Sequence, residues 1–377
     1  CKTILESADI QVVTKTDFTP EELQNEIGVY NGLIIRSSTQ CTPEILESAD
    51  KLQAICRAGV GVDNVNVPAA TKKGVIVMNT PGGNTTSTAE HAITLLLALS
   101  RNIAQACNSV REGKWERKKF TGTQVSGKVL GVIGLGKIGK EVAKRAIALE
   151  MKVLGYDPFI SNETIPQLNV QLVENLDEIY RQADYITLHI PLVNDTKHMI
   201  SKGELEIMKD GVRIINCARG GIISEDSLYD ALVSGKVAGA AIDVFEKEPP
   251  ENNKLLELDN VLPTPHLGAL TKEAQLAVAE DAAKQMVDVL KNNIIRNAVN
   301  MPVQGSEDKP YITLTEKMGA LLSQLVSGRI RSIDIQYSGG VSKDNVRPLT
   351  DCLLVGLLKD VFDENVNIVN ARVLVDE

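Results

Sequence analysis

A glycine-rich turn between two apolar runs constrains this chain more than any other stretch. The run from Val129 to Ile133 is apolar without alternation, which predicts a β-strand buried on both faces. Gly134, Gly136 and Gly139 follow in the spacing G-x-G-x-x-G, and apolar residues then recur at helical spacing from residue 138 to residue 149. The sequence therefore predicts a strand, a tight turn and a helix whose N-terminal N–H groups suit a phosphate.

An acidic residue ends the next predicted strand. This strand covers residues 152 to 157, and Asp157 at its carboxyl end can accept hydrogen bonds from ribose hydroxyls. A glycine hexad alone is a weak signal, since an ordinary tight turn gives the same pattern. The strand, the helix and the acid together favour a dinucleotide site. Asp157 would repel a 2′-phosphate, and no arginine follows it in residues 158 to 160, which predicts NAD rather than NADP.

Length, charge and cysteine usage exclude several classes of protein. A chain of 377 residues suggests two or three domains. Its net charge of -9 argues against a nucleic-acid-binding protein, which is usually basic. The 6 cysteines form no C-x-x-C pair, so we expect reduced thiols in a cytoplasmic protein and no metal site. No apolar run approaches the ~20 residues that a membrane-spanning helix needs.

The first 80 residues alternate short apolar runs with polar helical stretches, which predicts a parallel sheet with helices on its faces. Strands are predicted at residues 32–37, 52–59 and 75–79. They end in Arg36 and Ser37, in Arg57 and Gly59, and in Asn79. Carboxyl ends of parallel strands share the edge where open α/β sheets bind ligands. One such arginine is most simply a surface residue, but two at equivalent strand ends favour ligand binding.

The β/α pattern resumes after residue 83. Ser87 to Glu90 predicts a capping box at the start of a long helix. A basic loop at residues 113–120 then carries the single tryptophan, and an ordinary solvated charge run is an equally good interpretation of it. Strands are predicted at 185–191, 212–217, 237–243 and 261–265. Thr271 is expected to cap a helix that returns to the first sheet. The segment 303–377 predicts a small α/β module with strands at 333–337 and 371–375.

Three residues near predicted strand ends suggest acid–base chemistry on a carboxylic acid. Of the 4 histidines, only His266 lies at a strand end beside the predicted cofactor edge; His91, His189 and His198 have structural explanations. Arg219 follows a buried strand, and its planar guanidinium suits a carboxylate. Glu248 would favour the imidazolium form of His266 and fix its tautomer. Together with a nicotinamide cofactor, these residues indicate hydride transfer to or from a 2-oxo acid.

Several motifs resemble one known family in their order along the chain. The chain resembles the D-isomer-specific 2-hydroxyacid dehydrogenases in five motifs. These are the glycine turn and the segments 156–158, 216–221, 243–250 and 265–269. Residues 57–64, 79–81 and 115–120 narrow the resemblance to the branch that acts on 3-phosphoglycerate, and it covers about residues 1 to 300.

The resemblance implies two Rossmann-like α/β domains and a C-terminal regulatory module, in a long form truncated at both ends. The substrate-binding domain would combine residues 1–82 and 270–299, the NAD-binding domain would be 83–269, and an incomplete regulatory (intervening) domain would be 303–377.

The resemblance also implies the roles of individual residues. Arg219, Glu248 and His266 would form the catalytic trio. The expected NAD-binding residues are Val60, Gly134, Gly136, Lys137, Ile138, Gly139, Asp157, Ile190, Pro191, Cys217, Ala218, Asp243 and Gly268. The expected substrate-binding residues are Arg36, Ser37, Arg57, Gly59, Asn79, Arg117, Lys118, Arg219 and His266. Ile190 departs from the commoner threonine or cysteine, which leaves its backbone as the contact.

The expected reaction is the NAD-dependent oxidation of 3-phospho-D-glycerate to 3-phosphohydroxypyruvate, the first step of L-serine biosynthesis, by a homodimer or homotetramer. His266 would accept the hydroxyl proton, Glu248 would support its charge and Arg219 would hold the carboxylate. Two alternatives remain open. One is a hydroxypyruvate or glyoxylate reductase on the same scaffold. The other is an NAD-sensing scaffold of the C-terminal-binding-protein type, which keeps the trio but binds partner peptides and has no need of phosphate-directed arginines.

Overall fold

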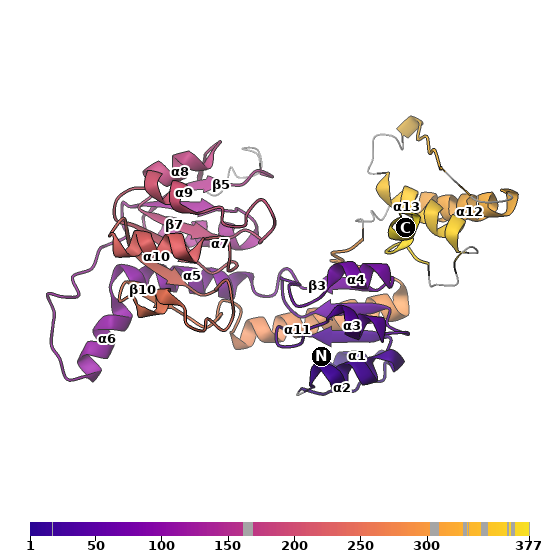
Figure 1. Ribbon diagram of the computed structural model, residues 1–377, viewed down its shortest axis with the longest axis horizontal. Helices are drawn as coiled ribbons and strands as arrows, with labels where there is room; N and C mark the ends of the chain where they lie inside the picture. The colour runs from indigo at the N-terminus through magenta and orange to yellow at the C-terminus, as the bar shows by residue number, and fades with distance from the viewer. Residues whose placement is uncertain are drawn as a thin grey trace. The chain divides into compact units, whose positions relative to one another are not determined.

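The structure is a computed structural model that describes residues 1–16, 18–160, 169–301, 309–326, 330, 332–340, 346–359, 362 and 366–376 (Figure 1). The chain divides into two compact units. Unit 1 comprises Cys1–Gly83 and Leu276–Glu377, and unit 2 comprises Asn84–Gln275. Within the described residues, no helix is both long enough and apolar enough to cross a membrane. The start of the predicted regulatory domain, residues 303–308, lies outside the described residues, and the division into three domains stays a prediction.

Unit 1 is built on a parallel sheet in the order β1 (Gly32–Ile35), β2 (Ala54–Arg57), β3 (Ile76–Asn79). One face of the sheet is covered by α2 (Pro20–Glu26), η1 (Ile27–Val29), α3 (Pro43–Glu47) and α4 (Val67–Lys72). The other face is covered by α1 (Lys2–Glu6), by α11 (Lys272–Val287) and by the π-helical turn η4 (Asp288–Asn292). Neighbouring residues of β2 alternate between the two cores: Ile55 faces the first, and Cys56 the second. The predicted parallel sheet is therefore confirmed.

Local caps explain where three of the helices that cover the unit 1 sheet begin, although α11 begins in the last residues of unit 2. Thr19 and Glu22 form a reciprocal capping box at α2, with N–H···O distances of 3.2 and 2.9 Å. The side chain of Asn66 accepts from the N–H of Ala69 at 3.0 Å to start α4. Thr271 accepts from the N–H of Ala274 at 3.2 Å, so the predicted cap of α11 is confirmed.

Unit 2 contains a seven-stranded parallel sheet in the order β10-β9-β8-β7-β4-β5-β6. Its strands are β4 (Val129–Ile133), β5 (Lys152–Tyr156), β6 (Gln171–Leu172), β7 (Tyr185–Leu188), β8 (Val212–Asn216), β9 (Val237–Ile242) and β10 (Val261–Pro263). Helices α5 (Thr85–Ser100) and α7 (Lys137–Ala148) cover one face. The other face carries α8 (Leu176–Gln182), α9 (Lys202–Ile207), α10 (Glu225–Val233) and η3 (Lys254–Glu257). Helices α8 and α9 lie side by side (Figure 1). The second predicted sheet is also confirmed.

One short helix of unit 2 stands apart from this layered body. Helix α6 (Ile103–Arg111) and the segment that follows it extend away from the rest of the unit (Figure 1). Ile103, Val110 and Trp115 are exposed apolar side chains on this extension, and Trp115 is 78% exposed. The predicted basic loop is therefore in solvent in the single chain.

The predicted capping box at Ser87 is wrong. Helix α5 already begins at Thr85, so Ser87 lies inside its first turns. The hydroxyl of Ser87 donates instead to the carbonyl oxygen of Gly268, at 2.8 Å. The hydroxyl of Ser87 therefore binds a residue that is far away in the sequence, and it does not cap the helix.

The described part of the C-terminal segment is helical, so both strands predicted there are wrong. It contains α12 (Lys309–Leu325), α13 (Arg347–Leu358) and α14 (Ala371–Asp376), and residues 333–337 have no regular structure. Residues 371–375 alternate in hydrophobicity as a strand does. However, Ala371 and Leu374 are the buried ones, at the spacing of one helical turn, and Arg372 binds the buried carboxylate of Asp351 at 2.6 Å.

Unit 1 is closed by a return segment after α11. The N–H of Val299 donates to the carbonyl of Val77 at 2.8 Å, and the N–H of Asn79 donates to the carbonyl of Asn297 at 3.2 Å. The side chain of Asn300 completes the ladder: its oxygen accepts from Val77 N–H and its amide donates to Val75 O, both at 2.9 Å. Asn300 thereby satisfies backbone groups at the edge of β3.

We predict that Asn300→Ala destabilises unit 1 by about 1–3 kcal/mol, because it leaves the Val77 N–H at the edge of β3 without its acceptor. Chemical denaturation of the whole chain measures this change. Asn292→Ala is the matched control, since that amide is exposed and makes one 3.3 Å hydrogen bond to Asp288. Equal stability of the two variants would contradict the role given to Asn300.

Candidate active site

Each of the three glycines in the turn after β4 is required for a different steric reason. Gly134 has φ +92°, and a Cβ there would lie 2.4 Å from the carbonyl oxygen of His189. A Cβ on Gly139 would lie 1.9 Å from the carbonyl oxygen of Gly134, so this glycine lets α7 pack against the strand. A Cβ on Gly136 would meet nothing within 4 Å. The space at Gly136 is thus left open for a ligand to approach the backbone.

The helix behind this turn has an N-terminus suited to an anion. Gly136 is the N-cap of α7 and provides no side-chain cap, and Lys137 and Ile138 are the first helical residues. Uncapped N–H groups and the positive end of the helix dipole favour a negatively charged group at this position. The pyrophosphate of a dinucleotide fits both the charge and the open space.

Asp157 is fixed beside the glycine turn by two backbone donors. One carboxylate oxygen accepts from the N–H of Leu135 and the other from the N–H of Phe159, both at 2.9 Å. These bonds tie the end of β5 to the turn after β4. The half-buried carboxylate is placed where the sequence predicts a partner for ribose hydroxyls. Ile190, which precedes the exposed Pro191, also lies against the turn, since its Cγ2 is 2.7 Å from a Cβ built on Gly134.

Arg219 is presented by a tight turn after β8. The side chain of buried Asn216 braces this turn, because its amide donates to the carbonyl of Arg219 at 2.9 Å and its oxygen accepts from Ala218 N–H at 3.0 Å. A Cβ on Gly220 would lie 1.8 Å from the carbonyl oxygen of Phe245, so the turn packs closely on the segment after β9. The half-buried guanidinium also donates to the carbonyl of Ala218 at 2.7 Å.

Glu248 and His266 form the pair that the sequence suggested. The Nδ1 atom of His266 lies 2.8 Å from Oε2 of Glu248, and both side chains remain partly exposed to solvent. Burial opposes ionisation of Glu248, but the hydrogen bond and charge of His266 outweigh it and hold the pKa of this carboxyl below its usual range. An ionised Glu248 orients the imidazole with Nδ1 as donor, which leaves Nε2 for another molecule.

Asp243, at the end of β9, organises the turn that carries His266. Its Oδ1 accepts from Thr264 Oγ1 at 2.6 Å and from Leu267 N–H at 2.8 Å, and its Oδ2 accepts from Gly268 N–H at 2.9 Å. Burial alone would raise the pKa of Asp243, but these donors and His91 keep it below its usual range. The carbonyl of Gly268 accepts from Ser87, so both backbone polar groups of this expected NAD contact are engaged within the protein.

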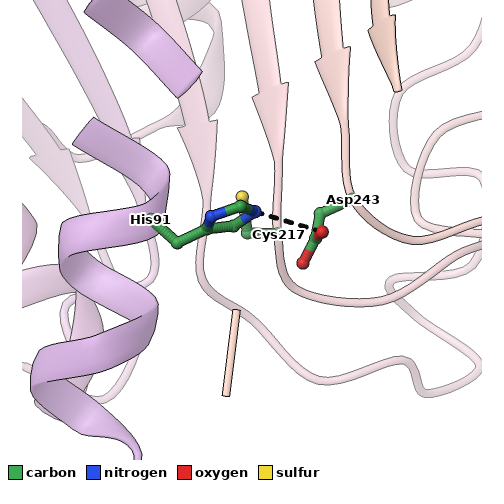
Figure 2. Close-up of side chains that lie close together, drawn as sticks. All are labelled: His91, Cys217 and Asp243. Atoms are coloured by element: carbon green, nitrogen blue, oxygen red, sulfur yellow. Dashed lines mark hydrogen bonds and ion pairs between the residues drawn. The ribbon is translucent and has the colours of Figure 1, made fainter. Parts of the chain in front are cut away.

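His91 reaches Asp243 from helix α5. Its Nε2 lies 3.1 Å from Asp243 Oδ1, and the thiol of Cys217 lies next to both (Figure 2). Burial raises the pKa of this thiol well above its ordinary value. Cys217 is therefore an uncharged residue that lines the site and does not act as a nucleophile. The sequence predicts only a structural place for His91 and does not reveal this contact with Asp243.

The remaining two histidines have the structural places expected of them. Burial lowers the pKa of His189 to about 4, and its Nε2 lies 3.0 Å from the hydroxyl of Thr187. His198 lies 3.1 Å from the carboxylate of Glu246 on the surface of unit 2.

The expected substrate residues of unit 1 gather at the carboxyl edge of its sheet. The guanidinium of Arg57 folds over Gly59, where a Cβ would lie 1.4 Å from an Arg57 nitrogen. Asn79 donates to the carbonyl of Val60 at 2.6 Å, which fixes the loop beside it. Arg36 and Ser37 are exposed at the end of β1, and the amide of Asn64 donates to the carbonyl of Arg36 at 2.9 Å. Arg117 and Lys118 are exposed in the extension of unit 2.

The missed site residues share one signal. Ser87, Thr88 and His91 are polar residues on one face of a helix whose middle is mostly apolar, and all three contact the strand-end loops after β9 and β10. Their spacing of three and four residues places them together on that face. Thr264 and Asn216 carry no such signal, because a single polar residue at a strand end is common.

Comparisons with known proteins show which family the chain is similar to. Residues 93–268 match the family model of the D-isomer specific 2-hydroxyacid dehydrogenase NAD binding domain. Residues 308–377 match that of the D-3-phosphoglycerate dehydrogenase intervening domain. The chain therefore carries an NAD-binding domain.

Curated relatives match along almost the whole chain. A D-3-phosphoglycerate dehydrogenase of Archaeoglobus fulgidus is 48% identical over 368 residues, which is 96% of this chain and 70% of the relative. The protein of the same name from Homo sapiens is 44% identical over 382 residues, which is 100% of this chain and 72% of the relative.

Solved structures share the fold with lower identity. A glyoxylate reductase from Paecilomyes thermophila has a TM-score of 0.73 at 29% identity and covers 79% of this chain and 94% of its own. A D-lactate dehydrogenase from Aquifex aeolicus, complexed with NAD and lactic acid, has a TM-score of 0.68 at 30% identity and covers 74% and 90%.

We predict that two alanine substitutions in the glycine turn affect different properties, NAD affinity in one case and stability in the other. Gly136→Ala places a methyl group in the open space where we expect the pyrophosphate to approach. The NAD-free protein should lose no more than about 1 kcal/mol, while NAD affinity should fall at least ~10-fold. Gly139→Ala forces a Cβ onto the Gly134 carbonyl and should destabilise the NAD-free protein by about 1–3 kcal/mol. Calorimetric titration with NAD and thermal unfolding measure both. Undiminished NAD affinity in Gly136→Ala would contradict this placement of the dinucleotide.

Proposed function

Because the chain belongs to the D-3-phosphoglycerate dehydrogenase family of D-isomer-specific 2-hydroxyacid dehydrogenases, we propose that it oxidises 3-phospho-D-glycerate to 3-phosphohydroxypyruvate with NAD as hydride acceptor. This reaction is the first step of L-serine biosynthesis. The observation that carries the proposal within the site is the 2.8 Å contact between His266 and ionised Glu248, on the turn organised by Asp243 in the NAD-binding domain.

His266 acts as the general base in the direction of oxidation. With Nδ1 donating to Glu248, its Nε2 carries the lone pair that accepts the proton of the C2 hydroxyl. Glu248 stabilises the imidazolium that results, because the negative charge lies 2.8 Å away. In the reverse direction the same imidazolium returns the proton to the C2 oxygen.

Arg219 holds the substrate carboxylate beside this base. Its guanidinium is planar and always charged, so it binds a carboxylate through two parallel hydrogen bonds. The brace from Asn216 and the close packing at Gly220 keep this arginine at a fixed position after β8. Gly136, Lys137, Ile138 and Asp157 would hold the dinucleotide, which when bound would supply the acceptor for the hydride from C2.

The phosphate of the substrate requires further cations. Arg36 and Arg57 follow or end two neighbouring strands, at the carboxyl edge of the unit 1 sheet. Ser37, Gly59 and Asn79 lie at the same edge and offer uncharged donors. We assign the phosphate to the two arginines because an acidic chain must place positive charge locally to bind a dianion.

We assign the extension of unit 2 to an interface with a second copy of the chain. Helix α6 and the loop after it expose Ile103, Val110 and Trp115 next to the charges of Arg117 and Lys118. Exposed apolar and aromatic groups of this kind mark protein interfaces. A homodimer or homotetramer in the cytoplasm would cover them and would bring Arg117 and Lys118 toward the substrate of the partner.

A reductase of hydroxypyruvate or glyoxylate is the second candidate, since the glyoxylate reductase structure shares the fold with a TM-score of 0.73. Steady-state oxidation of 3-phosphoglycerate, D-glycerate, D-lactate and glycolate with NAD separates the two. The proposal predicts that kcat/KM is highest for 3-phosphoglycerate. A higher value for an unphosphorylated acid would favour the reductase, and binding of NAD without turnover of any acid would favour an NAD-sensing scaffold.

We further predict that Arg57→Ala and Arg36→Ala each lower kcat/KM for 3-phosphoglycerate about ten- to a hundredfold, because each loses a charge-assisted hydrogen bond of roughly 1.5–3 kcal/mol. The value for D-glycerate should change much less. Lys51→Ala is the matched control, since it removes an exposed positive charge before the opposite end of β2. Equal losses on the two substrates would mean that the arginines do not bind the phosphate.

A further inference from the structure

The first turns of helix α5 hold the loop that carries His266. Two hydroxyls from this helix donate to the carbonyl of Gly268: Ser87 at 2.8 Å and Thr88 at 3.2 Å. One turn further along, His91 contacts Asp243 and Thr264 through its Nε2, at 3.1 and 3.3 Å. The four contacts lie on one face of α5 and all belong to unit 2.

His266 itself has an unusual backbone that depends on the same carboxylate. Its φ is +54°, in the left-handed region that residues with a Cβ rarely adopt. Its N–H donates to the carbonyl oxygens of Asp243 and Thr264, at 2.9 and 3.0 Å. The next two N–H groups donate to the Asp243 carboxylate. The orientation of that carboxylate therefore sets the conformation of the turn and, through it, the place of the imidazole.

His91, on helix α5, is a further group that orients the carboxylate of Asp243. Figure 2 shows its imidazole pointing from α5 directly at the carboxylate, with Cys217 behind it. The ligand atoms of these three residues lie within 4.8 Å of one another, a spacing that also suits a metal ion. Hydrogen bonding explains the cluster better. The carboxylate of Asp243 already accepts from three neighbours outside the cluster, and the buried thiol would have to lose a proton whose pKa is raised well above its ordinary value.

We propose that His91 is a positioning residue for the proton transfer at His266, a role that rests on the function proposed above. The Nε2–H of His91 donates to Asp243 Oδ1 and fixes the rotation of that carboxylate. Asp243 in turn holds residues 266–268, so that His266 Nδ1 stays 2.8 Å from Glu248. His91 touches neither substrate nor the reacting atoms, and its effect passes through Asp243.

Two substitutions at His91 separate this role from simple support of the fold. His91→Leu keeps the apolar bulk but removes the donor. The amide of His91→Gln can place an N–H near the position of Nε2. We expect His91→Leu to lower kcat on 3-phosphoglycerate about ten- to a hundredfold, as a small misplacement of a catalytic group does. The KM for 3-phosphoglycerate should change far less. His91→Gln should recover most of the lost turnover.

Ser100→Ala on the same helix is the matched control. The hydroxyl of Ser100 is buried and hydrogen-bonded to Leu96 O and to Tyr185, away from the His266 turn. This variant should be less stable with wild-type kcat. If His91→Leu is too unstable to purify, Thr264→Val removes the donor at 2.6 Å from the same carboxylate and should lower kcat in the same direction.

A spectroscopic readout distinguishes failure of this inference from failure of the proposed reaction. We expect the proton on Nδ1 of His266, which is shared with Glu248, to give a far-downfield proton resonance that His266→Asn would remove. We expect the resonance to shift or broaden in His91→Leu and to return in His91→Gln, whatever acid the enzyme oxidises. If 3-phosphoglycerate proves not to be a substrate, the resonance still tests His91. A wild-type resonance and wild-type kcat in folded His91→Leu would overturn the positioning role.

Discussion

The carboxylate of Asp243 is the interaction on which the rest of the site depends. It is buried at the end of a strand, yet it stays ionised because a hydroxyl, two backbone N–H groups and an imidazole donate to it. A buried charge without such donors would cost several kcal/mol. The same donors belong to the loop that carries His266 and to helix α5. Satisfying one buried charge therefore also fixes the conformation of the His266 turn, whose left-handed backbone would not be stable alone.

Parallel strand order explains why the functional groups converge. All pairings of the seven-stranded sheet are parallel, so the glycine turn, Asp157, Arg219, Asp243 and His266 leave the sheet at one edge although they are far apart in sequence. Steric constraints then set the loops: Gly139 and Gly220 approach other backbones too closely for any side chain, whereas Gly136 faces open space. In the turn after β4, different glycines thus serve the packing of the backbone and the space for a ligand.

Local and periodic features could be predicted from the sequence, and contacts between distant segments could not. A continuous apolar run located β4, and mainly apolar runs located β7 and β8, because strands that are buried on both faces carry few polar side chains. The residue pair Glu248–His266 was found because each follows a strand end. Ser87 was misassigned, because its partner Gly268 is remote in the chain. Residues 371–375 were misassigned as well, because alternation and helical spacing coincide over so short a run.

The central claim is that Glu248 and His266 act as one acid–base pair. The pH dependence of kcat/KM for NAD-linked oxidation, compared between the unaltered protein, Glu248→Gln and His266→Asn, tests it most directly. His266→Asn should lose about 10²–10⁴-fold in turnover while it still binds NAD. In Glu248→Gln the imidazolium loses its counter-charge, so the neutral base persists to lower pH and the acidic limb of the profile should move to lower pH. Near-normal turnover in His266→Asn, or an acidic limb that does not move in Glu248→Gln, would contradict the pair.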